Sequence, residues 1–103
     1  MSMKILISRR VFGTINSIYE YIARDSIYYA NITSEKLYTN IFYLENFPYM
    51  GRYVPEFSNK KYRELIYKSY RIVYNVSEET NIIFIHSIIH GKRNFSSLKN
   101  SFK

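Results

Sequence analysis

The stretch from Leu44 to Arg93 decides the fold of this 103-residue chain. It opens with Leu44-x-x-Phe47-Pro48-x-Met50-Gly51-Arg52-x-Val54-Pro55-Glu56. It continues with Tyr62-Arg63-Glu64-Leu65-Ile66 and Tyr70-Arg71-Ile72-Val73-Tyr74-x-Val76, and it ends with His90-Gly91-Lys92-Arg93. Proline and glycine mark a turn at its start, and the later segments are rich in β-branched and aromatic residues. The order predicts a turn, three short strands and a basic end.

Three strands are predicted in the second half of the chain, at residues 62–67, 70–76 and 81–89, because these runs are rich in Ile, Val, Tyr and Phe. Lys68-Ser69 is a tight link between the first two strands, and the polar run 77–80 joins the second to the third. Links this short suit antiparallel hairpins and not crossovers. The second strand alternates imperfectly, which predicts a central strand buried on both faces.

The first half of the chain predicts a short strand at residues 3–7 followed by two helices. Ser8 is placed to cap the first helix through its hydroxyl, and that helix should end near Arg24. Either Asp25 or Ser26 should cap the second helix. In both helices apolar residues recur at helical spacing, which predicts a helical hairpin with an aliphatic seam.

Pro48 should stop the second helix, because its ring disfavours helical geometry at the preceding residue. The expected order is therefore β-α-α-β-β-β, an α+β fold in one domain over residues 1–103. The expected core consists of Ile5, Ile7, Val11, Ile15, Ile18, Ile22, Leu37, Ile41, Leu44, Leu65, Ile72, Val73, Ile83 and Ile85.

The composition favours a folded cytoplasmic protein with an anionic partner. Hydrophobic residues make up 47% of the chain and charged residues 22%, as in ordinary soluble domains. The chain has no cysteine, which fits a reducing cytosol, and no run is long enough for a membrane span. The net charge of +7 favours polyanions or an acidic protein. Residues 86–103 contain no acid, and residues 94–103 predict a short docked helix or a frayed tail.

The chemistry open to the chain is narrow, because it has neither a phosphate-binding glycine loop nor a nucleophilic triad signature. His86 and His90 lie four apart on a predicted strand and should share one face, but no third ligand is evident, so neither a metal nor a cofactor is expected. Metal-free RNA cleavage remains, since it needs a base, an acid and cations around the phosphate. Residues of these types are Glu56, Arg63, Arg71, His90 and Arg93. The alternative for Arg71 is a structural ion pair with Glu56 or Glu64.

The run from Pro48 to Glu56, followed by Arg63-Glu64-Leu65, resembles the RelE/ParE superfamily of bacterial toxin–antitoxin toxins, and the ParE branch above all. The resemblance implies a helical hairpin packed on a mostly antiparallel sheet. RelE-type nucleases use a cluster of Lys and Arg plus a late Tyr. Here the run 62–66 holds an acid and apolar residues, no Tyr follows Arg93, and Arg93 alone resembles that active site.

YoeB-like nucleases of the same superfamily use a Glu, an Arg and a terminal His. Glu56, Arg71 and His90 align with these residues, but this chain continues past His90. Together with Arg93, they form the catalytic set that a ribosome-dependent mRNA endoribonuclease would use. ParE-like toxins lack the nuclease set and inhibit DNA gyrase. The resemblance therefore implies a gyrase inhibitor, with ribosome-dependent cleavage of mRNA as the alternative.

The resemblance also implies a partner, a cognate antitoxin with a DNA-binding dimer region and a tail that wraps the toxin. The basic charge of this chain predicts that the tail is acidic. The expected contacts with the antitoxin are the aromatic residues Phe12, Tyr19 and Tyr38, since aromatic rings are common interface anchors. The expected contacts with the target are Lys92, Arg93 and Lys99, from the acid-free end of the chain.

Overall fold

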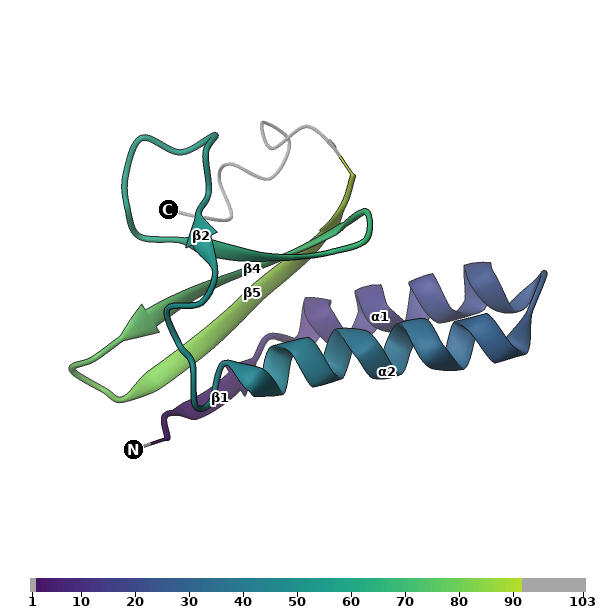
Figure 1. Cartoon of the computed structure of the whole chain (residues 1–103), viewed down its shortest axis with the longest axis horizontal. Helices are drawn as coiled ribbons and strands as arrows, with labels where there is room; N and C mark the ends of the chain where they lie inside the picture. The colour runs from purple at the N-terminus through teal and green to yellow at the C-terminus, as the bar shows by residue number, and fades with distance from the viewer. Residues whose placement is uncertain (1, 92–103) are drawn as a thin grey trace.

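The computed structural model describes residues 2–91. Its elements are β1 (Lys4–Ile7), α1 (Arg9–Ala23), α2 (Ile27–Tyr43), β2 (Arg52–Tyr53), β3 (Arg63–Tyr67), β4 (Tyr70–Ser77) and β5 (Ile82–His90). The strands form one sheet in the order β1-β5-β4-β3-β2, in which only the β1–β5 pair is parallel. The two helices lie together along one side of this sheet (Figure 1). The predicted α+β fold is confirmed, with β2 as an additional short strand.

A serine precedes each helix, but only one of the two serines caps its helix through the side chain. Ser26 caps α2, because its Oγ accepts a hydrogen bond from Tyr29 N at 3.2 Å. Ser8 precedes α1 but makes no side-chain cap, so that part of the prediction is wrong. Its Oγ instead donates to the carbonyl oxygen of His86 at 2.8 Å. This carbonyl is within reach because β1 pairs with β5, a contact that the sequence around Ser8 does not reveal.

The helix α2 ends at Tyr43, which is earlier than the predicted stop at Pro48. The next residues form turns, in which Phe47 N donates to Tyr43 O at 3.1 Å. The carbonyl of Glu45 accepts from Met3 N at 3.0 Å, so this segment is tied to the start of the chain. No helix within residues 2–91 has both the length and the apolar character needed to cross a membrane.

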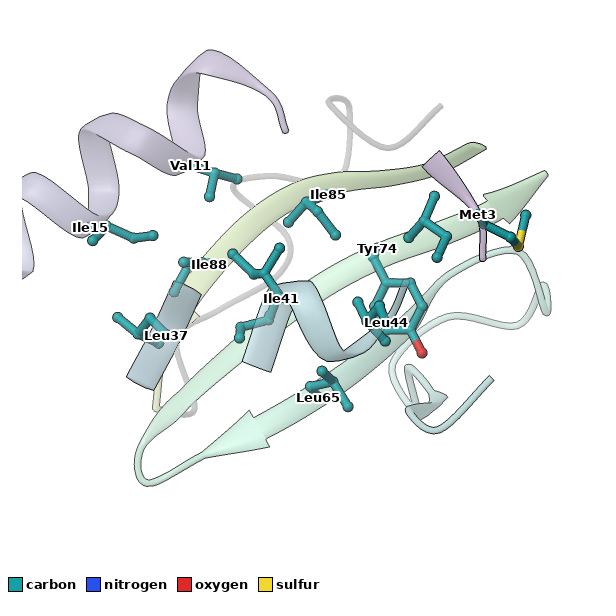
Figure 2. Packing of buried hydrophobic residues seen from close by; sticks show 12 residues of the cluster. Met3, Val11, Ile15, Leu37, Ile41, Leu44, Leu65, Tyr74, Ile85 and Ile88 are labelled. Carbon is teal, nitrogen blue, oxygen red and sulfur yellow. The ribbon is translucent and has the colours of Figure 1, made fainter. Parts of the chain in front are cut away.

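The main core lies between the helices and one face of the sheet, which we call the helix face. Val11 of α1 lies toward Ile85 of β5, and Leu37 of α2 lies toward Ile88 of the same strand (Figure 2). Ten of the predicted core residues are buried: Val11, Ile15, Leu37, Ile41, Leu44, Leu65, Ile72, Val73, Ile83 and Ile85. Ile5, Ile7 and Ile18 are only partly buried against this cluster, and Ile22 is partly exposed.

A smaller apolar cluster covers the opposite side of the sheet, which we call the outer face. It contains Val54, Tyr62, Val73 and Ile89, with Phe57 packed against them. The strand β4 therefore has buried residues on both faces, as its pattern predicted.

A β-bulge in β5 separates the two histidines. Val73 pairs with Ser87 while Tyr74 pairs with Ile85, which leaves His86 as the extra residue. The His86 ring packs edge-on against Tyr62 of the outer-face cluster. The His90 ring stacks on Tyr70, which packs against the core on the helix face. The expectation that the histidines share one face is therefore wrong, because the extra residue reverses the alternation between them.

The turn before β2 is fixed by a buried tyrosine hydroxyl. Tyr74 is fully buried, and its hydroxyl donates to Pro48 O and accepts from Gly51 N, both at 2.9 Å. A Cβ added at Gly51 would lie 2.6 Å from both the carbonyl oxygen of Glu64 and the Tyr74 hydroxyl. Only glycine fits here without a shift, and the close approach lets β2 pair with β3.

Candidate functional site

An ion-pair network on the outer face joins two of the candidate catalytic residues. The guanidinium of Arg71 meets Glu56 through two nitrogens, with Nη1 2.7 Å from Oε2 and Nη2 2.6 Å from Oε1. On another side it meets Glu64, with Nε 2.7 Å from Oε1. Both structural pairings considered for Arg71 are thus present together, and the arginine lies between two carboxylates.

The centre of this network is Glu64, whose side chain has no solvent exposure. Its second oxygen accepts a hydrogen bond from Arg52 Nε at 2.7 Å. A buried charge is tolerable only when it is paired and hydrogen-bonded, and Glu64 is held by two arginines. No buried side-chain nitrogen or oxygen within residues 2–91 lacks a partner. The two arginines and two glutamates balance one another in charge.

The network sets the protonation of its members. The hydrogen bonds from Arg71 hold the pKa of Glu56 below its ordinary value, although partial burial opposes this. The hydrogen bonds to Glu56 and Glu64 raise the pKa of Arg71. Glu56 is therefore an ionised carboxylate of low basicity. A phosphate that approached Arg71 would compete with two carboxylates already bound there.

His90, the third candidate, lies on the other side of the sheet. It stands opposite Tyr70 in the β4–β5 ladder, one residue from the Arg71–Ile89 pair, and neighbouring pairs face opposite ways. Its Nε2 lies 3.0 Å from Ser69 Oγ. Its ring also lines a cavity of about 570 Å³ between α1 and the end of β5. The structure brings Glu56 and Arg71 together and leaves His90 on the helix face.

The other candidate cations either lie away from Arg71 or lie outside the described residues. Arg63 also lies away from Arg71, since it pairs with Tyr53 and Tyr74 in the ladders next to Glu64. Lys92, Arg93 and Lys99 lie outside the described residues, as does the predicted tail 94–103. Among residues 2–91, no group of three His, Cys, Asp or Glu is arranged to hold a metal ion.

The residues expected to contact an antitoxin lie on the helical hairpin. Phe12 of α1 is half exposed, and its ring lies 6.2 Å from that of Tyr38 on α2. Tyr38 also packs against the core, and Tyr19 is partly buried. A shallow groove of about 510 Å³ runs along the outer side of α2 and is lined by Glu35, Tyr38, Thr39, Phe42, Tyr43 and Asn46.

Sequence reasoning missed Arg52 as a member of the network, because β2 was not predicted. The sequence predicts Glu64 only as a possible partner of Arg71. The two-residue link Lys68-Ser69 was a usable signal for this contact. A hairpin closed at that link places residues 64, 66, 71 and 73 on one face. The contact between Glu64 and Arg71 follows from that register.

Solved structures of toxin–antitoxin proteins share this fold. The chromosomal ParDE system of Pseudomonas aeruginosa superposes with a TM-score of 0.72 at 16% identity, over 88% of this chain and 98% of that one. The RelBE2 complex of Mycobacterium tuberculosis gives 0.65 at 12% identity, over 87% and 99%. The isolated Escherichia coli RelE toxin gives 0.65 at 14% identity, over 99% and 100%. The fold is that of the RelE/ParE superfamily.

The sequence narrows this class to one family. The family model of the ParE toxin of the type II toxin–antitoxin system parDE matches residues 5–95, which is most of the chain. The chain therefore belongs to the ParE toxin family and is a toxin of a type II toxin–antitoxin system. No curated protein matches it in sequence.

Proposed function

We propose that this toxin inhibits DNA gyrase, and that a cognate antitoxin neutralises it in the cytoplasm. The observation that carries the proposal is the arrangement around Arg71. Metal-free RNA cleavage needs a base and an acid on either side of one phosphate, within hydrogen-bond reach of the reacting oxygens. Glu56 and His90, the candidates for these roles within residues 2–91, lie on opposite faces of the sheet.

The ion pairs around Arg71 support the same conclusion. Arg71 holds Glu56 and Glu64 at 2.6–2.7 Å, so its positive charge is balanced within the protein. An arginine that stabilises the charge of a phosphorane has to direct donors to the phosphate oxygens. The hydrogen bonds also lower the pKa of Glu56, which weakens it as a base. These contacts favour a structural role for both residues.

The target contacts that we propose are Lys92, Arg93 and Lys99. They belong to an acid-free stretch of the sequence that runs from His86 to Lys103. Cations there suit acidic groups of gyrase or phosphates of its DNA. Hydrogen bonds to charged groups contribute about 1.5–3 kcal/mol each when well formed. Toxicity should then depend on these cations and not on an acid–base pair.

Three single variants test this proposal in a gyrase supercoiling assay. Arg93→Ala should abolish inhibition, while Glu56→Ala and His90→Ala, once shown to be folded by circular dichroism, should keep most of it. A ribonuclease predicts the reverse order, with Glu56→Ala and His90→Ala losing cleavage of ribosome-bound mRNA. If Arg93→Ala still inhibits gyrase fully, the proposed role of the basic end in gyrase inhibition is wrong.

The antitoxin is proposed to dock across the helical hairpin and a sheet edge. Phe12 and Tyr38 form a joint aromatic contact between α1 and α2, and Tyr38 also lines the groove on the outer side of α2. An apolar face of a partner helix fits such a groove. The net charge of +7 favours a partner segment rich in Asp and Glu, as an antitoxin tail would supply.

A further inference from the structure

At the β2 edge of the sheet, one arginine contacts two tyrosine rings. The guanidinium carbon of Arg63 lies 4.2 Å from the centroid of the Tyr53 ring and 5.1 Å from that of Tyr49. Arg63 is held in place because its Nη1 donates to Gly51 O at 2.7 Å. The Tyr49 hydroxyl bonds to the carboxylate of Glu78, which anchors the second ring. We call Tyr49, Tyr53 and Arg63 the tyrosine–arginine stack.

The stack is accessible from solvent. Tyr49 is 47% exposed and Tyr53 is 42% exposed, so a large part of each ring can be reached by another molecule. This exposure is unusual for rings that are already fixed by neighbours, since exposed side chains normally keep their rotamer freedom. Two half-exposed rings that neighbouring side chains already contact form a platform on which a planar group can stack at a low entropic cost.

Cations surround this platform. Lys60 Nζ lies 5.7 Å from the centroid of the Tyr53 ring, and Nζ of the exposed neighbouring residue Lys61 lies 5.4 Å from the centroid of the Tyr62 ring. Residues 49–63 contain four Lys or Arg and one acid, and that acid, Glu56, is bound by Arg71. No carboxylate of the described residues forms an ion pair with Lys60, Lys61 or Arg63.

We propose that the tyrosine–arginine stack and the cations around it bind single-stranded nucleic acid. Bases would stack on Tyr53 and Tyr49, and phosphates would lie against Arg63, Lys60 and Lys61. Aromatic rings interleaved with cations suit single strands, because every base offers a flat face and every nucleotide a negative charge. A duplex hides its base faces, so it would use only the cations. The proposal goes beyond gyrase inhibition and does not depend on it.

This surface is separate from both functional regions discussed above. Tyr53 and Arg63 form one pair of the β2–β3 ladder, and Arg52 and Glu64 form the next, so the stack faces away from Glu64 and Arg71. The basic end, Lys92 to Lys99, is a different segment of the sequence. Variants in the surface therefore leave the ion-pair network and the basic end unchanged.

Fluorescence anisotropy with labelled 15-nucleotide dT and rU strands tests the proposal on the full-length protein. Tyr53→Ala should weaken binding by about fivefold or more, the usual effect of losing one stacked base. Neutralising three phosphates predicts a wild-type salt slope of about −2, or roughly 20-fold weaker binding at 200 mM than at 50 mM salt. Lys60→Gln/Lys61→Gln should make this slope shallower by about 1.4. Preference for dT or rU identifies DNA or RNA as the natural strand.

Two control variants remove the same types of side chain, a tyrosine and a pair of lysines, from other parts of the protein. Tyr28→Ala removes a tyrosine that is 68% exposed near the start of α2, whereas Tyr49 of the tyrosine–arginine stack follows the end of that helix. Lys4→Gln/Lys36→Gln removes two exposed lysines from β1 and α2. Both should bind the strands as wild type does. The proposal is overturned if the wild type binds neither strand, if it prefers a duplex, or if the surface variants lose no more affinity than the controls.

Discussion

At the scale of single residues, two side chains tie separate parts of the sequence together. Tyr74 of β4 fixes the turn at Pro48 and Gly51 through its hydroxyl. Arg71 of the same strand fixes Glu56, which lies in the loop between β2 and β3. Because these two residues project from opposite faces of one central strand, β4 positions the loops on both sides of the sheet.

Replacing Tyr74 by phenylalanine should destabilise the protein by about 1–3 kcal/mol. The ring volume is kept, but the amide of Gly51 loses its acceptor and the carbonyl of Pro48 loses its donor. Urea denaturation measures the change in the unfolding free energy. The matched control is Tyr21→Phe, because Tyr21 is 68% exposed. Equal midpoints for the two variants would contradict the role given to the Tyr74 hydroxyl.

Glu56→Gln should alter the pH dependence of stability. The folded-state pKa of Glu56 is lowered by Arg71, so its stabilisation is complete above its ordinary value of 4.5 and disappears as pH falls through the folded pKa. Wild type should therefore have the higher Tm at pH 7, and the difference should shrink as the pH falls below 4.5 and vanish once Glu56 is protonated in the folded state. Because the Glu56 side chain is 42% exposed, the difference at pH 7 should be about 1 kcal/mol or less. A Tm difference that stays constant with pH would contradict the ion pair.

At the scale of elements, α2 and β4 contribute the central contacts of the core. Leu37 and Ile72 are both fully buried, and each belongs to the cluster between the helices and the sheet. Packing of this kind leaves a cavity when a side chain is truncated, because the surroundings relax only in part.

Leu37→Ala and Ile72→Ala should each cost roughly 2–5 kcal/mol of unfolding free energy. Ile66→Ala, on neighbouring β3, provides the control, because Ile66 is 52% exposed. It should change stability by less than about 1 kcal/mol. Chemical denaturation of the three variants under one set of conditions gives the comparison, and unchanged midpoints for both core variants would reject this core.

Local signals predicted most elements, and contacts between distant segments explain the failures. The Lys68-Ser69 link and the β-branched runs were enough to predict β3, β4 and β5, since hairpin geometry is local. The strand β2 is only two residues long and exists because Tyr74 fixes the turn before it, 23 residues away in the sequence from Gly51. The bulge at His86 also has no local signal. It places His86 and His90 on opposite faces, so of the predicted candidates Glu56, Arg71 and His90 only Glu56 and Arg71 lie together.

At the scale of the whole molecule, we expect positive charge and exposed aromatic rings to govern association with partners. The chain carries 15 Lys and Arg against 8 Asp and Glu. A partner with the opposite charge should be steered toward it over a distance that shrinks as salt is added. The helical hairpin adds half-exposed aromatic residues such as Phe12, which can provide the short-range contacts.

Binding of the cognate antitoxin should depend both on long-range charge attraction and on short-range aromatic contacts. Its association rate should fall steeply with salt, and its affinity should fall about 30-fold or more in Phe12→Ala if Phe12 is an anchor. Stopped-flow kinetics and calorimetry measure the two quantities, with Ile66→Ala as a control away from the hairpin. A basic antitoxin, or an association rate that does not depend on salt, would contradict the electrostatic part of this prediction.

We propose above all that this ParE-family toxin acts on gyrase and does not cleave RNA. The most direct measurement applies one preparation of the wild-type protein to two reactions, DNA supercoiling by gyrase and primer extension on ribosome-bound mRNA. We predict that supercoiling is inhibited and that the mRNA gives full-length products. Discrete codon-dependent cuts in the mRNA, together with undisturbed supercoiling, would contradict the claim.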